Sequence, residues 1–137
     1  MLLGDGSQSY MEELKQDIKT RNLEDRFIWH EAVPNEQLYK IYSAADVAVW
    51  PWGASAGLLE AMSCNLPIII GKDSMVTELV DFENGFTYEE GDVANLAQQM
   101  EKLIDPQLRE KMGANSRRYI ESRLNWRSLA QQFIELV

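Results

Sequence analysis

The 137-residue sequence has little cysteine, with Cys64 as its one example, and its one histidine is His30. A single cysteine excludes an intrachain disulfide framework and a multi-cysteine zinc cage, and it fits a reducing compartment. No stretch approaches the ~20 consecutive apolar residues of a membrane span, and residues 1–15 lack the basic flank and long apolar run of a signal peptide. We therefore expect a soluble, intracellular protein.

Basic residues are also scarce, since 13 of them face 22 acidic residues and the net charge is −9. Such a chain repels a phosphate backbone, so the charge argues against a nucleic-acid partner. A phosphate that binds here must be held by local geometry. No Asp-x-Asp pair or cluster of histidine and carboxylates is present in the sequence, so we expect neither a metal nor another cofactor.

Short apolar segments alternate with segments of helical spacing through the first half of the chain. The strands are expected at 1–3, 26–33, 46–50, 66–70 and 86–88, and the helices at 10–22, 35–45, 57–64, 92–104, 106–124 and from a cap at Asn125 onwards. This rhythm predicts an α/β fold with a Rossmann-like parallel sheet flanked by helices and a helical carboxyl-terminal tail. Without a repeat or linker, residues 1–137 read as one domain.

The loop "GASAG" at residues 53–57 follows the third strand, where an open parallel sheet places its ligands. Ser55 is a candidate N-cap, which would leave the N–H groups of Ala56, Gly57 and Leu58 bare at the positive end of a helix. Such a helix end can hold a phosphate. Glu60, one turn further on, could accept two hydrogen bonds from a diol such as a ribose. The alternative is that the small residues only allow tight packing and that Glu60 is an ordinary surface residue.

The chain resembles a known family in the combination of "LLGDG", "AADVAVWP", "LLEAM", "LPIII" and "ENGF" at their spacings. These segments are similar to those of the carboxyl-terminal domain of family 4 glycosyltransferases, which are retaining, nucleotide-sugar-dependent enzymes of the GT-B fold. The resemblance covers nearly the whole chain. It implies a hexosyltransferase of polysaccharide biosynthesis, in which this domain binds the sugar-nucleotide donor.

The resemblance also implies roles for individual residues around the loop. Glu60 matches the family's glutamate that binds the donor ribose, and Ser55, Ala56 and Gly57 match the backbone that meets the diphosphate. The family's other signature glutamate, which contacts the transferred sugar, falls at Trp52, where this chain has no carboxylate. That departure leaves the donor sugar open.

Five further residues are interpreted from the same resemblance. The strand at 26–33 ends where relatives hold the nucleotide base, so Trp29 and His30 are candidates for base contacts. Ser74 and Met75 replace the paired glycines that relatives commonly show before a glutamate matching Glu78. For Glu78 a local cap or ion pair is the favoured interpretation over a ligand contact.

Relatives carry segments that this sequence lacks, namely an acceptor domain and the first strand and helix of the sheet. We therefore expect a fragment that is inactive alone. The whole protein would transfer a sugar with retention to an acceptor glycan or lipid-linked saccharide bound by the missing domain, in the cytoplasm or at the inner face of the membrane.

Two alternatives come from single features of the sequence. A dinucleotide-dependent oxidoreductase is suggested by Gly4 and Gly6 after a strand, but Ser9 stands where the third glycine of that fingerprint belongs. A non-catalytic nucleotide-binding or interaction module derived from the same fold is suggested by Trp52 in place of the sugar-contacting glutamate.

Overall fold

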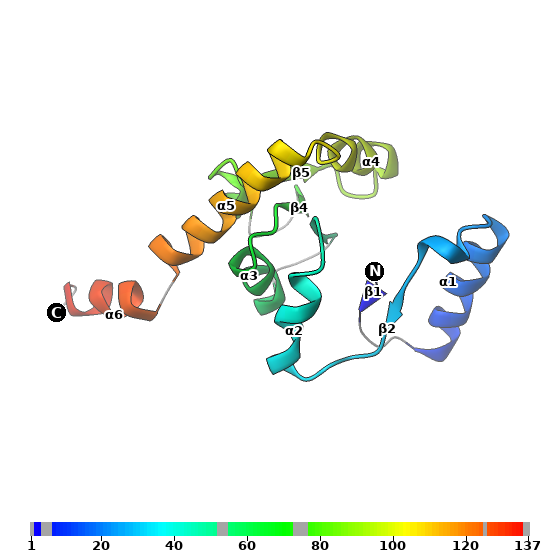
Figure 1. Cartoon of the computed structure of the whole chain (residues 1–137), viewed down its shortest axis with the longest axis horizontal. Helices are drawn as coiled ribbons and strands as arrows, with labels where there is room; N and C mark the ends of the chain where they lie inside the picture. Colours follow the sequence, from blue (N-terminus) through cyan, green and yellow to red (C-terminus); the bar gives the residue numbers. More distant parts are fainter. Residues whose placement is uncertain (1, 4–6, 52–54, 73–76, 125, 136–137) are drawn as a thin grey trace. The chain divides into compact units, whose positions relative to one another are not determined.

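The computed structural model describes residues 2–3, 7–51, 55–72, 77–124 and 126–135 (Figure 1). The chain groups into two units, Met1–Leu38 and Tyr39–Val137, and each is described by itself. The boundary between them falls within helix α2, Asn35–Tyr42. The single domain over residues 1–137 stays a prediction.

The first unit pairs two short parallel strands and adds a helix. Strand β1, Leu2–Leu3, pairs with β2, Trp29–His30, in the register Leu2 to Trp29 and Leu3 to His30. Helix α1, Gln8–Thr20, begins after Ser7, whose hydroxyl accepts a hydrogen bond from the Tyr10 amide at 3.4 Å. The predicted strand at 26–33 is mostly wrong. Arg26 belongs to a 3₁₀ turn, Glu24–Arg26, and of the predicted strand residues only Trp29 and His30 pair with the strand Leu2–Leu3.

The second unit is built on a three-stranded parallel sheet of order β3-β4-β5. The strands are β3, Ala48–Trp50, β4, Ile68–Gly71, and β5, Gly85–Tyr88. The helical elements are α3, Ala56–Ser63, the 3₁₀ helix η2, Thr77–Val80, α4, Val93–Lys102, α5, Pro106–Arg123, and α6, Trp126–Glu135. All three parallel strands and the four α-helices of this unit after α2 were predicted, with boundaries that differ by a few residues.

Aspartate side chains cap the starts of two of these helices. The Asp92 carboxylate accepts from the Asn95 amide at 2.9 Å, and the Asp105 carboxylate accepts from the Gln107 amide at 2.9 Å. Pro106 occupies the first turn of α5, where its missing N–H leaves no bond unmade. The predicted cap at Asn125 lies outside the described residues. No helix within the described ranges is both long and apolar enough to cross a membrane.

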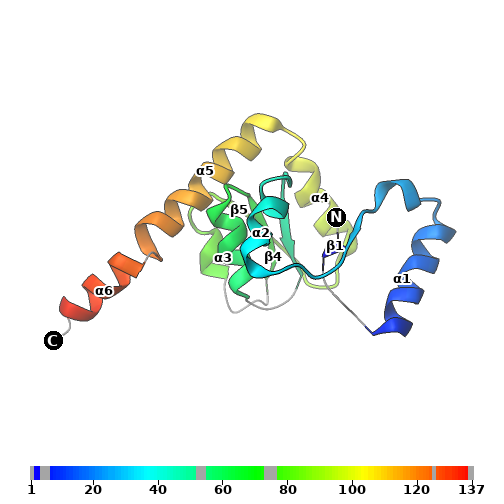
Figure 2. The ribbon, with the colours of Figure 1, turned by 60° about the horizontal axis from the view of Figure 1, so that its bottom comes forward.

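The sheet buries both of its faces, because successive side chains of a strand point to opposite sides. Ile68 and Ile70 of β4 pack with Leu58 and Met62 of α3, whereas Ile69 packs with a second cluster. That second cluster contains Tyr88, Leu103 and Met112, and Leu96 of α4 packs against it. The sheet is therefore covered by α3 on one face and by α4 on the other (Figure 2), which confirms the predicted fold class.

Helix α5 runs across the amino ends of the three strands. Its residues contact the segments that precede each strand: the Arg109 guanidinium lies 3.5 Å from the Asp46 carboxylate, Arg117 donates to the Ser63 carbonyl, and Asn115 donates to the Glu83 carbonyl. Gly113 lies so close to this edge that a Cβ atom there would be 2.0 Å from the Asn65 carbonyl oxygen. The absence of a side chain at Gly113 is therefore what allows α5 to lie against the sheet edge.

Candidate functional site

The start of helix α3 lies at the carboxyl end of strand β3, where parallel α/β sheets place their ligand sites. Ser55 occupies the predicted N-cap position with extended backbone, φ −138° and ψ 157°. Its hydroxyl makes no capping bond, which corrects the sequence prediction. Instead, the indole N–H of Trp50 donates to the Ser55 hydroxyl oxygen at 3.0 Å. This bond draws the hydroxyl toward the end of β3.

Two of the three predicted free amides are available at this helix end. The Leu58 amide donates to the Ser55 carbonyl at 3.0 Å, so the prediction that it is bare was wrong. The first amides of a helix have no acceptor within it. Among the described residues, none accepts a hydrogen bond from the amides of Ala56 or Gly57. Ala56 and Gly57 therefore offer two backbone donors at the positive end of α3.

Gly57 is closely surrounded by two aromatic side chains. A Cβ atom on Gly57 would lie 2.9 Å from the Tyr42 hydroxyl oxygen and 3.2 Å from the Trp50 ring. Both aromatic residues are half-buried against the core that contains Leu58. Tyr42 falls in the helix predicted at 35–45 and Trp50 in the strand predicted at 46–50, and the sequence carries no signal that both meet Gly57.

Glu60 lies on α3 one turn after Ala56 and is half-buried. Leu58, which is 1% exposed, and Met62 on the same helix are buried in the core. No residue of the described ranges pairs with the Glu60 carboxylate. A partly buried carboxylate without a partner remains able to accept hydrogen bonds from a ligand.

The Tyr42 hydroxyl lies in the electrostatic field of the same helix face. Burial raises the pKa of Tyr42, and the Coulombic interactions with Glu60 and Cys64 raise it further. The phenol is therefore neutral at physiological pH and able to donate. No described residue accepts from it, so Tyr42 adds a donor beside the amides of Ala56 and Gly57.

Replacing Tyr42 by phenylalanine is expected to change how stability depends on alkaline pH. The folded-state pKa of Tyr42 lies above the unfolded value, so its stabilising contribution is complete below that value and is lost as pH rises through the folded pKa. Urea unfolding of the wild type should show a steeper loss of stability above pH ~10 than Tyr42→Phe. Tyr39→Phe, which removes an exposed phenol from the same helix, is the control. Parallel profiles for wild type and Tyr42→Phe would contradict the assignment.

The remaining predicted residues are distributed differently. Trp29, half-buried, and His30, exposed, both lie in β2 of the first unit, where the Lys15 ammonium is 5.6 Å from the centre of the Trp29 ring. Glu78 is exposed in the first turn of η2. Trp52, Ser74 and Met75 lie outside the described residues, as do Gly4 and Gly6. In the part of the chain that the structure describes, no group of three or more histidine, cysteine, aspartate or glutamate residues could hold a metal ion.

The fold and this helix end define the class of protein. They describe an α/β protein with a Rossmann-like parallel sheet whose ligand-facing edge presents backbone donors and a free carboxylate. The comparisons with known proteins go further. The family model described as "Glycosyl transferases group 1" matches residues 2–119, and the chain belongs to that family.

Two relatives of known name share the sequence. The capsular polysaccharide biosynthesis glycosyltransferase CapM of Staphylococcus aureus is 31% identical over 101 residues, which cover 67% of this chain and 27% of CapM. A GDP-mannose-dependent α-(1-6)-phosphatidylinositol monomannoside mannosyltransferase of Mycolicibacterium smegmatis is 25% identical, over 96% of this chain and 38% of the relative. The chain thus spans well under half the length of either protein.

A solved structure matches the fold over almost the entire chain. HepE of Anabaena, in complex with UDP and glucose, is 26% identical with a TM-score of 0.85, over 98% of this chain and 39% of HepE. The same protein is also known in complex with UDP-glucose. The agreement confirms that the chain folds like a domain of a GT-B glycosyltransferase.

Proposed function

We propose that this chain is the donor-binding domain of a retaining, family 4 glycosyltransferase, which transfers a hexose from a nucleoside diphosphate sugar to an acceptor hydroxyl. The observation that carries the proposal is the pair of available amides at Ala56 and Gly57, one helical turn from the unpaired carboxylate of Glu60. The complexes of HepE with UDP and UDP-glucose support the choice of ligand class.

The amides of Ala56 and Gly57 would hold the diphosphate. When the sugar departs, negative charge grows on the leaving diphosphate, and fixed N–H donors stabilise it without having to reorient. The positive end of α3 acts in the same direction. The backbone donors would stabilise the charge of the leaving diphosphate, which a metal cation does in other enzymes. The proposal therefore includes no metal or other cofactor. Trp50 supports these free amides, because its indole N–H binds the Ser55 hydroxyl, which then does not cap helix α3.

Glu60 would position the donor rather than react. Its carboxylate can accept hydrogen bonds from both hydroxyls of a ribose, which orients the nucleotide relative to the diphosphate. Tyr42 contributes a neutral hydroxyl beside Gly57. Trp29 and His30 remain proposals for base contacts, with uridine and guanosine as the candidate bases, and Trp52 remains a proposal for a contact with the donor.

Replacing Glu60 by alanine is expected to weaken UDP binding by ~1 to 3 kcal/mol, or about 5- to 150-fold, because the ribose loses its acceptor. Isothermal titration calorimetry of this chain with UDP and with GDP measures the change. Glu101→Ala removes an exposed carboxylate from α4 and is the matched control. Equal affinities for wild type and Glu60→Ala would contradict the ribose assignment, and no binding by either protein would contradict the donor site.

The whole protein's acceptor is part of the proposal and rests on the family alone. An acceptor glycan or lipid-linked saccharide would bind to a domain outside this sequence, on the cytoplasmic side of the membrane. A non-catalytic module is the second candidate, because Trp52 stands where relatives carry the sugar-contacting glutamate. Turnover of a nucleotide sugar by the full-length protein would exclude that module, whereas tight nucleotide binding without turnover would support it.

A further inference from the structure

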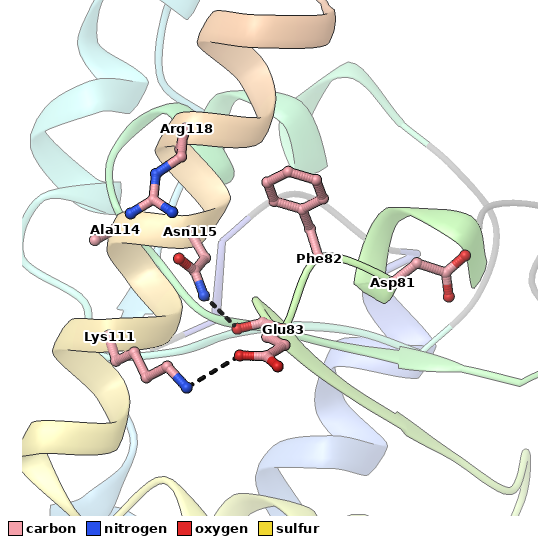
Figure 3. A pocket seen from close by; sticks show the side chains of 7 residues that line it. All are labelled: Asp81, Phe82, Glu83, Lys111, Ala114, Asn115 and Arg118. Atoms are coloured by element: carbon pink, nitrogen blue, oxygen red, sulfur yellow. Dashed lines mark hydrogen bonds and ion pairs between the residues drawn. The ribbon is translucent and has the colours of Figure 1, made fainter.

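A pocket lies at the amino ends of the strands, at the opposite end of the sheet from the start of α3. It has a volume of about 550 Å³ and is formed between residues 81–83 and helix α5 (Figure 3). Residues 81–83 precede strand β5, whereas α3 follows the carboxyl end of β3. Because the three strands are parallel, the residues that precede β5 and those that follow β3 lie at opposite ends of the sheet. The pocket is thus separate from the donor site, and its volume falls within the range of small-ligand pockets.

The walls of this pocket are held in place by several bonds. The Asn115 side-chain amide donates to the Glu83 carbonyl at 3.0 Å, and the Lys111 ammonium lies 3.0 Å from the Glu83 carboxylate (Figure 3). Glu83 has a positive φ of 51°, which non-glycine residues adopt only where the surroundings hold them. Ser116 donates to the carbonyl of the next residue, Asn84, at 3.4 Å. The turn is therefore preorganised against α5.

Three groups of the pocket are left for a ligand. The Asp81 carboxylate and the Arg118 guanidinium are exposed, and neither has a partner among the described residues. The Phe82 ring lies between them (Figure 3) and makes an edge-to-face contact with Tyr119, with ring centres 5.6 Å apart. The pocket thus combines an apolar ring, a free acceptor and a planar free donor.

The balance of charge in the lining selects a neutral ligand. Two carboxylates, Asp81 and Glu83, line the same pocket as two cations, Lys111 and Arg118. An anion attracted by Arg118 would be repelled by the two carboxylates. A cationic ligand attracted by Asp81 would be repelled by Lys111 and Arg118. A neutral molecule with both donors and acceptors, and with one apolar face, satisfies all three free groups.

We propose that this pocket binds a neutral saccharide, whose C–H face would pack on Phe82 while hydroxyls on two different parts of it bond to Asp81 and to Arg118, which lie on opposite sides of the ring (Figure 3). A hydroxyl group can donate to a carboxylate and can accept from a guanidinium, so a saccharide offers a partner to each of these two side chains. The site would hold a glycan segment away from the donor edge. It does not depend on the donor site, because none of its residues lies near the start of α3.

The test is an NMR titration of the ¹⁵N-labelled chain with maltose and with an α-linked mannobiose. Saturable shifts of the amides of residues 81–83 and 114–118, with weak affinity, are expected for at least one disaccharide. Arg118→Ala and Asp81→Ala should each weaken binding at least about fivefold, since each removes a charged hydrogen-bond partner. Arg123→Ala, on the same helix outside the pocket, should leave binding unchanged. Glu60→Ala should leave it unchanged as well.

Comparison ligands complete the experiment. Inorganic phosphate and a neutral tripeptide are titrated under the same conditions, and neither should shift these amides as strongly as the disaccharides. Absence of saturable shifts with both disaccharides at tens of millimolar would overturn the proposal. Stronger binding of phosphate or of the peptide would overturn it too, in favour of an anion site or a peptide site. Phe82→Leu, which keeps an apolar side chain against Tyr119, tests the role of the ring without emptying its place.

Discussion

Replacement of Gly113 by alanine is expected to destabilise the second unit by ~3 kcal/mol, although alanine is the better helix former. The added Cβ would lie 2.0 Å from the Asn65 carbonyl oxygen and 2.9 Å from its carbonyl carbon. Both are backbone atoms, so no side chain can rotate to relieve the overlap. Asn65 itself has a positive φ of 60° at the end of α3 and cannot shift without disturbing that helix. Helix α5 would have to move away from the sheet edge.

Urea unfolding followed by circular dichroism measures this effect. Ala114→Gly, at the next and exposed position of α5, is the matched control and should cost about 1 kcal/mol from helix propensity alone. Gly113→Ala adds a methyl group and Ala114→Gly removes one, yet both substitutions should lower the free energy of unfolding. A Gly113→Ala protein as stable as the wild type, or more stable, would show that α5 is not packed against Asn65 as described.

Replacement of Asn84 by aspartate is expected to lower stability by ~2 to 4 kcal/mol at neutral pH. Asn84 is 0% exposed, and neither polar atom of its side chain has a hydrogen-bond partner among the residues that the structure describes. A carboxylate in that place would be buried without compensation, so the fold would keep the group protonated. Protonating an aspartate of pKa ~3.9 at pH 7 costs ~4 kcal/mol, which sets the upper limit of the loss.

The pH dependence of stability distinguishes the cost of burying a carboxylate from the cost of steric strain. The new aspartate would have a folded-state pKa above its unfolded value, so the penalty is full at pH 7 and disappears as pH falls below the unfolded value of ~4. Differences in unfolding free energy between Asn84→Asp and wild type are measured at both pH values. Gln98→Glu, exposed on α4, is the control. An equal difference at pH 7 and at pH ~4 would mean that steric strain, not charge, is responsible.

The fold could be predicted where each signal is contained in a short segment. The apolar run at residues 66–70 indicated a strand of the parallel sheet, and Ile68, Ile69 and Ile70 alternate between two clusters. The starts of the helices predicted at 92–104 and 106–124 could be predicted because a capping Asp92 and a first-turn Pro106 both act within a few residues. The prediction of a strand at 26–33 was wrong in length, because β-propensity does not determine how many residues will form hydrogen bonds with a neighbouring strand.

The candidate site could be predicted only in part, for a similar reason. The helix end at Ser55 and Ala56 follows from the local run of small residues. The competing bond from Trp50 to Ser55 and the position of Tyr42 beside Gly57 depend on tertiary packing. The pocket between residues 81–83 and α5 has no sequence signal, since its two walls lie about thirty residues apart in the chain and each reads as an ordinary charged surface.

The burial of Asn84 also bears on how this protein ages. Asparagine followed by glycine is the dipeptide most prone to deamidation, in which the glycine nitrogen attacks the side-chain carbonyl, a cyclic imide forms and ammonia leaves. In the fold, Gly85 is pressed against β4, where even a Cβ atom would lie 2.0 Å from the Ile68 carbonyl oxygen, and ring closure has no room. Native molecules are thus protected during storage. Each excursion to the unfolded state exposes the dipeptide, and water then opens the imide to isoaspartate or aspartate. Either product places a carboxylate where the native state buries the Asn84 side chain, so loss of material should accelerate once unfolding begins.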